Sequence, residues 1–203
     1  MLFSSVSFLF YFLPCVLAVY FAVPGNLKNG VLLLASLVFY GWGGPRYVLV
    51  MLAAIAQGYA FGLLIGRYRG TKRAKLFLVI SAALNLGMLG YFKYADFLIA
   101  NVNALTGLSV PLLRVALPIG VSFYTFQILS YIVDVYRGTV PAQRSFVDLA
   151  AYVAMFPQLI AGPIVRYADI AAQLDSRTHS FAAASKGARR FIILTCIAFA
   201  VGT

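Results

Sequence analysis

The side chain best suited to acid–base chemistry in this sequence is its single histidine, His179. An imidazole changes charge near neutral pH, so a positioned histidine can take a proton from a hydroxyl group. His179 stands within the polar run 175–180, where Ser180 fits the N-cap of a following helix. We therefore expect a solvated loop histidine without a catalytic role. The two cysteines have no zinc-site spacing, and no metal is predicted.

The second candidate for chemistry is the run Gly120-Val-Ser122-Phe-Tyr124, which superficially matches the nucleophile elbow of serine hydrolases. That motif needs a second glycine after the serine and a strand before the turn. This sequence provides neither feature. We exclude a serine hydrolase.

Polar side chains also recur inside the long apolar segment 117–137. Tyr124 and Gln127 are one helical turn apart, as are Gln127 and Tyr131, and Asp134 follows on a neighbouring face. Polar groups inside a membrane are costly unless they face other helices or a water-filled path. The pattern leaves two interpretations open, which are hydrogen bonds between helices and a substrate path. Tyr124, Gln127 and Asp134 are the path candidates.

The elements that position these residues are predicted to be membrane helices. The 203 residues are 63% hydrophobic and only 10% charged, whereas soluble domains have about 25% charged residues. Runs without Lys, Arg or Asp mostly reach the roughly 17 to 25 residues that cross a bilayer as a helix. These runs are 1–27, 29–45, 47–66, 76–92, 97–113, 115–133, 149–165 and 191–203. No run alternates like a barrel strand, so the predicted fold is an all-α, polytopic membrane protein.

The charge distribution predicts a topology. The chain has a net charge of +11. In a membrane protein, an excess of Lys and Arg is expected in the cytoplasmic loops, so nucleic acid is not an expected partner. The loop 67–75 carries five cations and no acid, so we predict that it is cytoplasmic. Counting back through two spans places Lys28 on the same side and the N-terminus outside. Residues 94–114 are too polar for a span and are predicted to lie in the membrane interface, before a span at 115–133.

A re-entrant segment is predicted within the apolar run 149–165, directly before the charged segment 166–190. Segment 166–190 has a net charge of +3 and prefers the cytoplasm, although one full crossing at 149–165 would place it outside. Pro157 and Pro163 stand where a helix would have to break. Broken backbone inside a membrane must be buried in protein or line a cavity, so Gln158 and Pro163 join the substrate-path candidates.

Two further patterns are predicted to be structural. Ala54, Gly58, Gly62 and Gly66 recur every four residues on one face of the span at 47–66, which allows another helix to approach closely. Aromatic residues near the ends of spans are interpreted as interfacial belts. This set contains Tyr40, Trp42, Tyr47, Tyr68, Tyr91 and Tyr167.

Two long motifs resemble the membrane-bound O-acyltransferase (MBOAT) family. The first is the run Leu117-Pro-Ile-Gly-Val-Ser-Phe-Tyr-Thr-Phe-Gln-Ile-Leu-Ser-Tyr-Ile-Val-Asp-Val-Tyr-Arg137, and the second is Phe156-Pro-Gln-Leu-Ile-Ala-Gly-Pro-Ile-Val-Arg-Tyr167. The N-terminal Met1-Leu-Phe-Ser-Ser and the stretch Lys93-Tyr-Ala-Asp96 fit as well, so the resemblance covers essentially the whole chain.

The resemblance implies a ring of tilted helices around a thinned membrane, with a tunnel where an acyl donor meets its acceptor. It implies O-acetylation of an exopolysaccharide such as alginate at a bacterial inner membrane, with acetyl-CoA or a derived acetyl group as donor and no bound cofactor. Periplasmic acetylation and export proteins are the implied partners, beside the lipid bilayer. The family's catalytic histidine is expected beyond residue 203. Residues 1–203 would then be the N-terminal part of one membrane-embedded domain, ending within a transmembrane helix.

Two other functions remain open from the residues alone. A transporter also uses broken helices with polar residues at the membrane midplane, although the spans show no evident inverted repeat. A non-catalytic membrane scaffold for polysaccharide export is the third reading. In a scaffold, Tyr124, Gln127 and Asp134 would serve only helix interfaces.

Overall fold

The computed structural model describes residues 7–107, 109–113, 117–118, 120–159, 165–175, 185–187 and 189. Within these residues it is helical and contains no strand. The elements are a π-helical turn η1 (Phe8–Phe12), α1 (Leu13–Ala22), a 3-10 turn η2 (Gly25–Leu27), α2 (Lys28–Gly41), α3 (Pro45–Arg67), α4 (Lys72–Thr106), α5 (Val121–Arg137), α6 (Phe146–Ala154), α7 (Phe156–Leu159) and α8 (Tyr167–Asp175). The all-α prediction is confirmed.

Among the described residues, two helices are long and apolar enough to cross a membrane, namely α3 with 23 residues and α4 with 35. The helical segment Phe10–Ala22 and the 14-residue α2 are apolar but shorter. Helix α5 has 17 residues and includes Asp134 near its C-terminal end. The structure therefore has apolar helices where several spans were predicted, and two of them reach spanning length.

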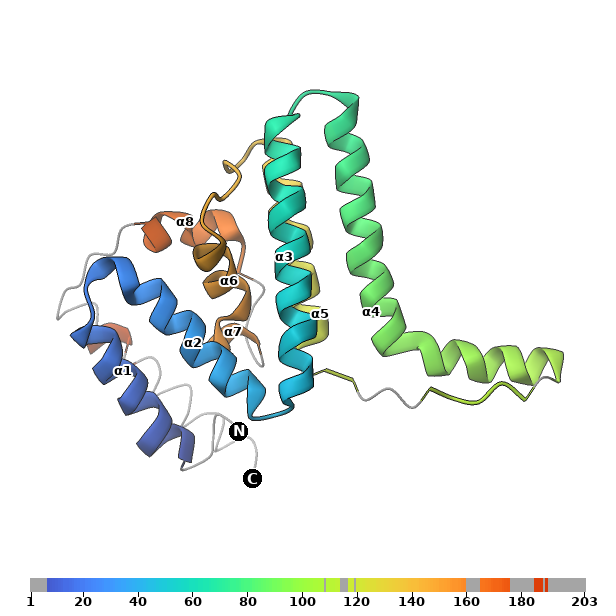
Figure 1. Ribbon diagram of the computed structural model, residues 1–203, viewed down its shortest axis with the longest axis horizontal. Helices are drawn as coiled ribbons and strands as arrows, with labels where there is room; N and C mark the ends of the chain where they lie inside the picture. Colours follow the sequence, from blue (N-terminus) through green and yellow to red (C-terminus); the bar gives the residue numbers. More distant parts are fainter. Residues whose placement is uncertain are drawn as a thin grey trace.

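The core forms around α3, which packs against α5, α4 and α6 (Figure 1). The small-residue face of α3 is the contact surface, as predicted. A Cβ added at Gly58 would meet Ile128 of α5, and one added at Gly62 would meet the ring and hydroxyl of Tyr131. A step toward the C-terminus on α3, from Gly58 to Gly62, is matched by a step toward the C-terminus on α5, from Ile128 to Tyr131. The two helices are therefore parallel neighbours.

Helix α5 is displaced from the span predicted at 115–133. It begins at Val121, directly after Gly120, whose φ of 75° lies in the left-handed region. Pro118 has no N–H, and its carbonyl accepts the Val121 N–H at 3.2 Å. The helix ends at Gly138, also left-handed, whose N–H donates to the Asp134 carbonyl at 2.9 Å. These two glycines, rather than the charges, determine the bounds of the helix.

Helix α4 joins two elements that were predicted separately, a span at 76–92 and an interface helix over 94–114. It is one helix that bends in its course, and its last turns point away from α3 (Figure 1). Gly107, with a φ of 70°, ends it earlier than predicted. Residues 109–113, which follow, have no regular secondary structure.

The chain doubles back between α6 and α8. Helix α6 ends at Met155, where the backbone is non-helical, and Pro157 fits the first turn of α7 because its missing N–H would have no helical partner there. The Phe156 N–H donates to the hydroxyl of Ser36 at 3.3 Å. The Asn29 amide donates both to Asp148 at the start of α6 and to the Leu174 carbonyl near the end of α8. The beginning and the end of this excursion therefore lie beside the same residue of α2.

Candidate functional site

The polar side chains of α5 are buried. Tyr124 and Tyr131 are 0% exposed, Gln127 is 2% exposed and Asp134 is 6% exposed. They follow one another at intervals of three and four residues, so they share a broad face of the helix. The sequence predicted that these residues face protein rather than lipid, and their burial agrees with this. The structure distributes them into two groups along the helix rather than gathering them in one site.

The first group joins α5 to the broken segment. The Gln127 amide donates to Oε1 of Gln158 at 3.2 Å, and this bond links α5 to α7. The other end of the Gln127 amide, its Oε1, is buried without a hydrogen-bond partner among the described residues, as is the Thr125 hydroxyl. The Tyr124 hydroxyl is buried beside that of Tyr40. Buried polar atoms without partners are rare, because each costs about 1 to 3 kcal/mol. This group therefore has unused hydrogen-bonding capacity in the interior.

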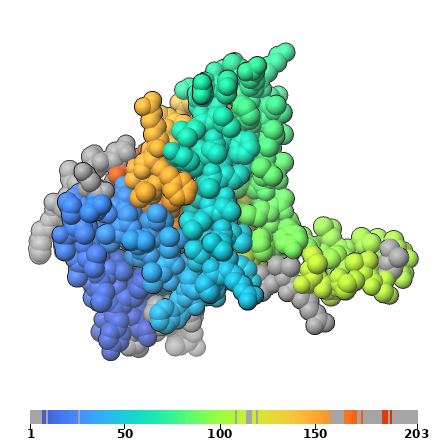
Figure 2. Space-filling view, viewed as in Figure 1, coloured from blue at the N-terminus to red at the C-terminus, as the bar shows by residue number. Residues whose placement is uncertain are grey.

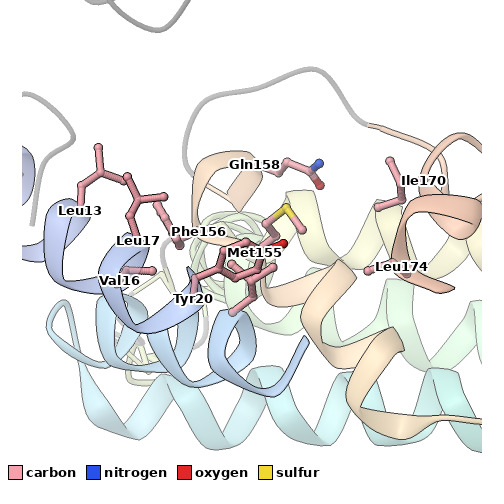
Figure 3. Close-up of a pocket in the computed structure, with 10 residues that line it drawn as sticks. Leu13, Val16, Leu17, Tyr20, Met155, Phe156, Gln158, Ile170 and Leu174 are labelled. Atoms are coloured by element: carbon pink, nitrogen blue, oxygen red, sulfur yellow. The ribbon is translucent and has the colours of Figure 1, made fainter. Parts of the chain in front are cut away.

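Gln158 also borders a cavity of about 350 Å³. The lining is mostly apolar and comes from α1, α2, the α6–α7 break and α8 (Figure 3). Leu13 and Leu17 lie on one side of the cavity, Ile170 and Leu174 lie on the other, and Gln158 lies between them (Figure 3). The cavity residues are Leu13, Val16, Leu17, Tyr20, Leu32, Met155, Phe156, Gln158, Ile170 and Leu174. Gln158 thus connects an apolar chamber with the buried polar atoms of α5.

The second group surrounds the C-terminal end of α5. The ring of Tyr167 lies 5.1 Å from that of Tyr131 and 5.4 Å from that of Tyr152, measured between centroids. The Tyr152 hydroxyl donates to the Val165 carbonyl at 2.8 Å. Asp134 interacts electrostatically with this hydroxyl, and its Oδ2 is buried without a partner among the described residues. This group holds the returning chain against α5.

Gln143 organises the loop between α5 and α6. Its backbone N–H donates to the Tyr131 hydroxyl at 3.0 Å, and its side-chain amide donates to the Tyr167 hydroxyl at 2.9 Å. Its Oε1 accepts the backbone N–H groups of Arg144 and Ser145. One residue therefore fixes the loop to α5 through its backbone and to α8 through its side chain. A lone glutamine between helices gives no signal of this role in the sequence.

Two residues assigned to the aromatic belts belong to the core instead. Tyr40 is 7% exposed and Tyr167 is 3% exposed, and both belong to the main hydrophobic cluster. Their places near the ends of apolar runs suggested an interfacial position. That assignment was wrong because α2 ends against α5 and because α8 folds back onto it. Trp42, at 68% exposure, and Tyr91, at 51%, do lie on the surface.

A further polar cluster lies between α3 and α4. The Gln57 amide donates to the Ser81 hydroxyl at 2.8 Å and accepts from the Asn85 amide at 2.8 Å. Ser81 is 0% exposed and Asn85 is 2% exposed. Gln57 pairs with both residues, while Oδ1 of Asn85 is buried without a partner among the described residues. The cluster is a helix-to-helix connection away from the cavity.

The remaining predicted site residues lie outside the described part of the chain. Pro163 and His179 both fall there, and their surroundings are not assigned. Among the described residues, no group of three or more His, Cys, Asp or Glu side chains could hold a metal ion.

The chain is similar to several named O-acetyltransferases. It is 43% identical over 197 residues to a protein of Pseudomonas syringae pv. tomato named probable alginate O-acetylase AlgI, and the match covers 95% of this chain and 38% of that protein. The AlgI protein of Azotobacter vinelandii is also 43% identical, over 95% of this chain and 40% of its own length. A peptidoglycan O-acetyltransferase of Helicobacter pylori is 30% identical over 89% of this chain and 40% of its length. No family model and no solved structure matches the chain.

The chain is thus similar to proteins named as O-acetylases and O-acetyltransferases, and this similarity supports the resemblance to membrane-bound O-acyltransferases. Within that class, the alginate O-acetylases are relatives at 40% to 43% identity. The chain spans about two fifths of the length of these curated relatives.

Proposed function

We propose that this chain is part of a membrane-bound O-acetyltransferase that acetylates an exopolysaccharide such as alginate. The observation that carries the proposal is the identity of 40% to 43% with alginate O-acetylases over 95% of the chain. The Helicobacter pylori relative is also named for the transfer of an acetyl group, but the acceptor in its name is peptidoglycan. Acetyl transfer to polysaccharide hydroxyls is therefore the common chemistry.

The reaction forms an ester at a sugar hydroxyl. The hydroxyl oxygen attacks the acetyl carbonyl carbon, the bond from that carbon to its donor breaks, and the hydroxyl proton passes to a base. We propose a histidine beyond residue 203 as this base, and acetyl-CoA or an acetyl group derived from it as the donor on the cytoplasmic side. Residues 1–203 alone are then inactive, and periplasmic acetylation and export proteins take over the product.

The role of this chain in that reaction is to form part of the path. Tyr124 and Gln127 supply buried polar atoms, and Gln158 connects them to the apolar cavity. Pro163 and Asp134 are further members of the proposed path. The doubling back of the chain at Asn29 supports a re-entrant segment, because both of its ends return to the N-terminal end of α2. Such a segment brings broken backbone to the membrane interior, where it must be buried in protein or line a cavity.

The proposal is tested by removing the gene and measuring two properties of the secreted polysaccharide, its amount and its acetyl content. We expect the acetyl content to disappear while the amount is maintained. A transporter would instead lose secretion, and that result would contradict the proposal. Reintroducing the intact protein should restore acetylation, whereas reintroducing residues 1–203 alone should not.

A further inference from the structure

The last part of α4, residues 94–106, is an arm that does not pack on the core. The buried residues of α4 are Ala74, Ser81, Asn85 and Leu89, and none lies beyond Leu89. The arm turns away from α3 and projects from the rest of the molecule (Figures 1 and 2). Something other than the described helices must therefore be its environment.

The arm has two chemically different faces. Large apolar side chains recur at intervals of three and four residues on its outer face and are 45% to 87% exposed, and they are Tyr94, Phe97, Leu98, Val102 and Leu105. Asp96 and Asn103 lie on the opposite face, seven residues apart. Asn101 also lies on the outer face, where its amide donates to the Phe97 carbonyl one turn earlier at 2.8 Å. Apart from this one amide the outer face is apolar, which makes the arm an amphipathic helix.

The polar face is occupied by the chain itself. Residues 109–113, here called the strap, have no regular secondary structure and run back along the arm. The Asn103 side chain donates to the Val110 carbonyl at 2.8 Å and accepts the Val110 N–H at 3.0 Å. Asp96 accepts the Leu113 N–H at 2.8 Å. The strap therefore satisfies the polar residues of the arm, and the apolar face stays uncovered among the described residues.

The part of α4 before the bend is about as long as a bilayer is thick. Its N-terminal end adjoins the basic tip, which we define as Arg67, Arg69, Lys72, Arg73 and Lys75, all of them exposed. From Lys72 to Lys93 the helix rises about 32 Å at 1.5 Å per residue, and the hydrocarbon core of a bilayer is about 30 Å thick. Lys93 is exposed and lies over the Tyr94 ring at 5.5 Å from the centroid. Lysine and tyrosine are typical of the boundary between lipid tails and water.

We propose that the arm lies in the membrane interface of the leaflet opposite the basic tip, with its outer face in the lipid. The exposed apolar surface of the preceding part of α4, which includes Leu76, Val79 and Leu84, continues into this face. The arm is about 20 Å long, too short to span a bilayer. Helices with one apolar face and one polar face commonly bind in the plane of the interface. The inference does not depend on the proposed acetyl transfer.

The test uses single-tryptophan variants of the intact protein in vesicles of phosphatidylcholine and phosphatidylglycerol. Trp42→Phe removes the one native tryptophan of this chain, and tryptophans in the rest of the protein are replaced likewise. Leu98→Trp and Leu105→Trp place the probe on the outer face. Ala100→Trp, exposed on another side of the same helix, is the matched control. Quenching is measured with lipids that are brominated high in their acyl chains.

We expect fluorescence from both outer-face probes to be quenched at least about twofold more than fluorescence from the Ala100→Trp control, because only the outer face contacts acyl chains. Equal quenching of all three probes would overturn the proposal, since it would indicate an arm immersed in lipid on all sides. Unquenched, red-shifted emission from the outer-face probes would place the face in water. Unquenched, blue-shifted emission would place it against protein and would equally overturn the proposal.

Discussion

Gln158 is the residue at which the apolar cavity and the buried polar atoms of α5 meet. Its Oε1 accepts from Gln127 at 3.2 Å while its side chain borders the cavity. Replacing it with leucine leaves the Gln127 amide donor buried without this acceptor, at a cost of about 1 to 3 kcal/mol. If the cavity belongs to the substrate path, Gln158→Leu should lower the acetyl content of the secreted polysaccharide at matched membrane abundance.

The matched control for this prediction is Gln57→Leu. It removes three hydrogen bonds, two to Ser81 and one from Asn85, and so carries at least as large a structural cost away from the cavity. We expect Gln57→Leu to lower thermal stability but not acetylation per folded molecule. Equal acetylation in both variants would remove Gln158 from the substrate path.

His179 is predicted to be dispensable. It stands in a polar, basic segment of the sequence, outside the apolar runs, and loss of a general base typically lowers a rate by about 10² to 10⁴. His179→Ala in the intact protein should leave the acetyl content nearly unchanged. A loss of acetylation of tenfold or more would show that the only histidine of this chain takes part in the reaction.

The contact between α3 and α5 depends on the absence of side chains on α3. A Cβ at Gly62 would lie 2.8 Å from the Tyr131 hydroxyl, and Tyr131 is held in place by the Gln143 N–H. Overpacking at Gly62→Ala should destabilise the protein by about 1 to 3 kcal/mol. The higher helix propensity of alanine offsets roughly 1 kcal/mol of this cost. Thermal unfolding in detergent measures this difference.

Gly87→Ala is the control on α4. No heavy atom lies within 4 Å of a Cβ added there, so only the gain in helix propensity of about 0.5 to 1 kcal/mol remains. We expect Gly87→Ala to be neutral or stabilising. A similar melting temperature for the Gly62 and Gly87 variants would contradict the tight α3–α5 packing.

The elements differ in how far the sequence predicted them. The glycine face of α3 was predictable, because a four-residue spacing specifies a helix face without reference to the partner. The bounds of α5 were not, because the left-handed backbone at Gly120 and Gly138 is a local conformation that charge-free runs do not report. The core position of Tyr167 was missed because it depends on how α8 folds back onto α5, and that of Tyr40 because it depends on Tyr124 of α5 lying beside it. Both are tertiary properties.

At the scale of the whole molecule, the cations lie mainly at one end. The basic tip joins α3 to α4, and Arg69 of the tip lies against Gly138 at the end of α5. Arg137 is exposed beside that glycine, and Lys28 begins α2 next to Asn29, which contacts the start of α6. Parallel α3 and α5 therefore bring the C-terminal end of α5 to the same side as the tip, and the contact of Asn29 with α6 places Lys28 near that side. The positive-inside rule assigns this side to the cytoplasm.

Cysteine labelling tests this orientation. Cys15 and Cys196 are first replaced by serine, and a single cysteine is then introduced as Thr71→Cys in the tip or as Trp42→Cys in the turn between α2 and α3. An impermeant maleimide reagent added to spheroplasts should label position 42 and should label position 71 only after permeabilisation. The reverse pattern would invert the topology.

The parallel pairing of α3 and α5 has a consequence for synthesis. Gly58 faces Ile128, so about 70 residues must be added after the glycine face is made before its partner helix is complete. At translation rates of about 5 to 20 residues per second, the face stays unpaired for several seconds. During that interval α3 can associate with any other helix that tolerates a small-residue surface. We therefore expect newly inserted α3 to depend on an insertase or on α4 to shield this face until α5 arrives.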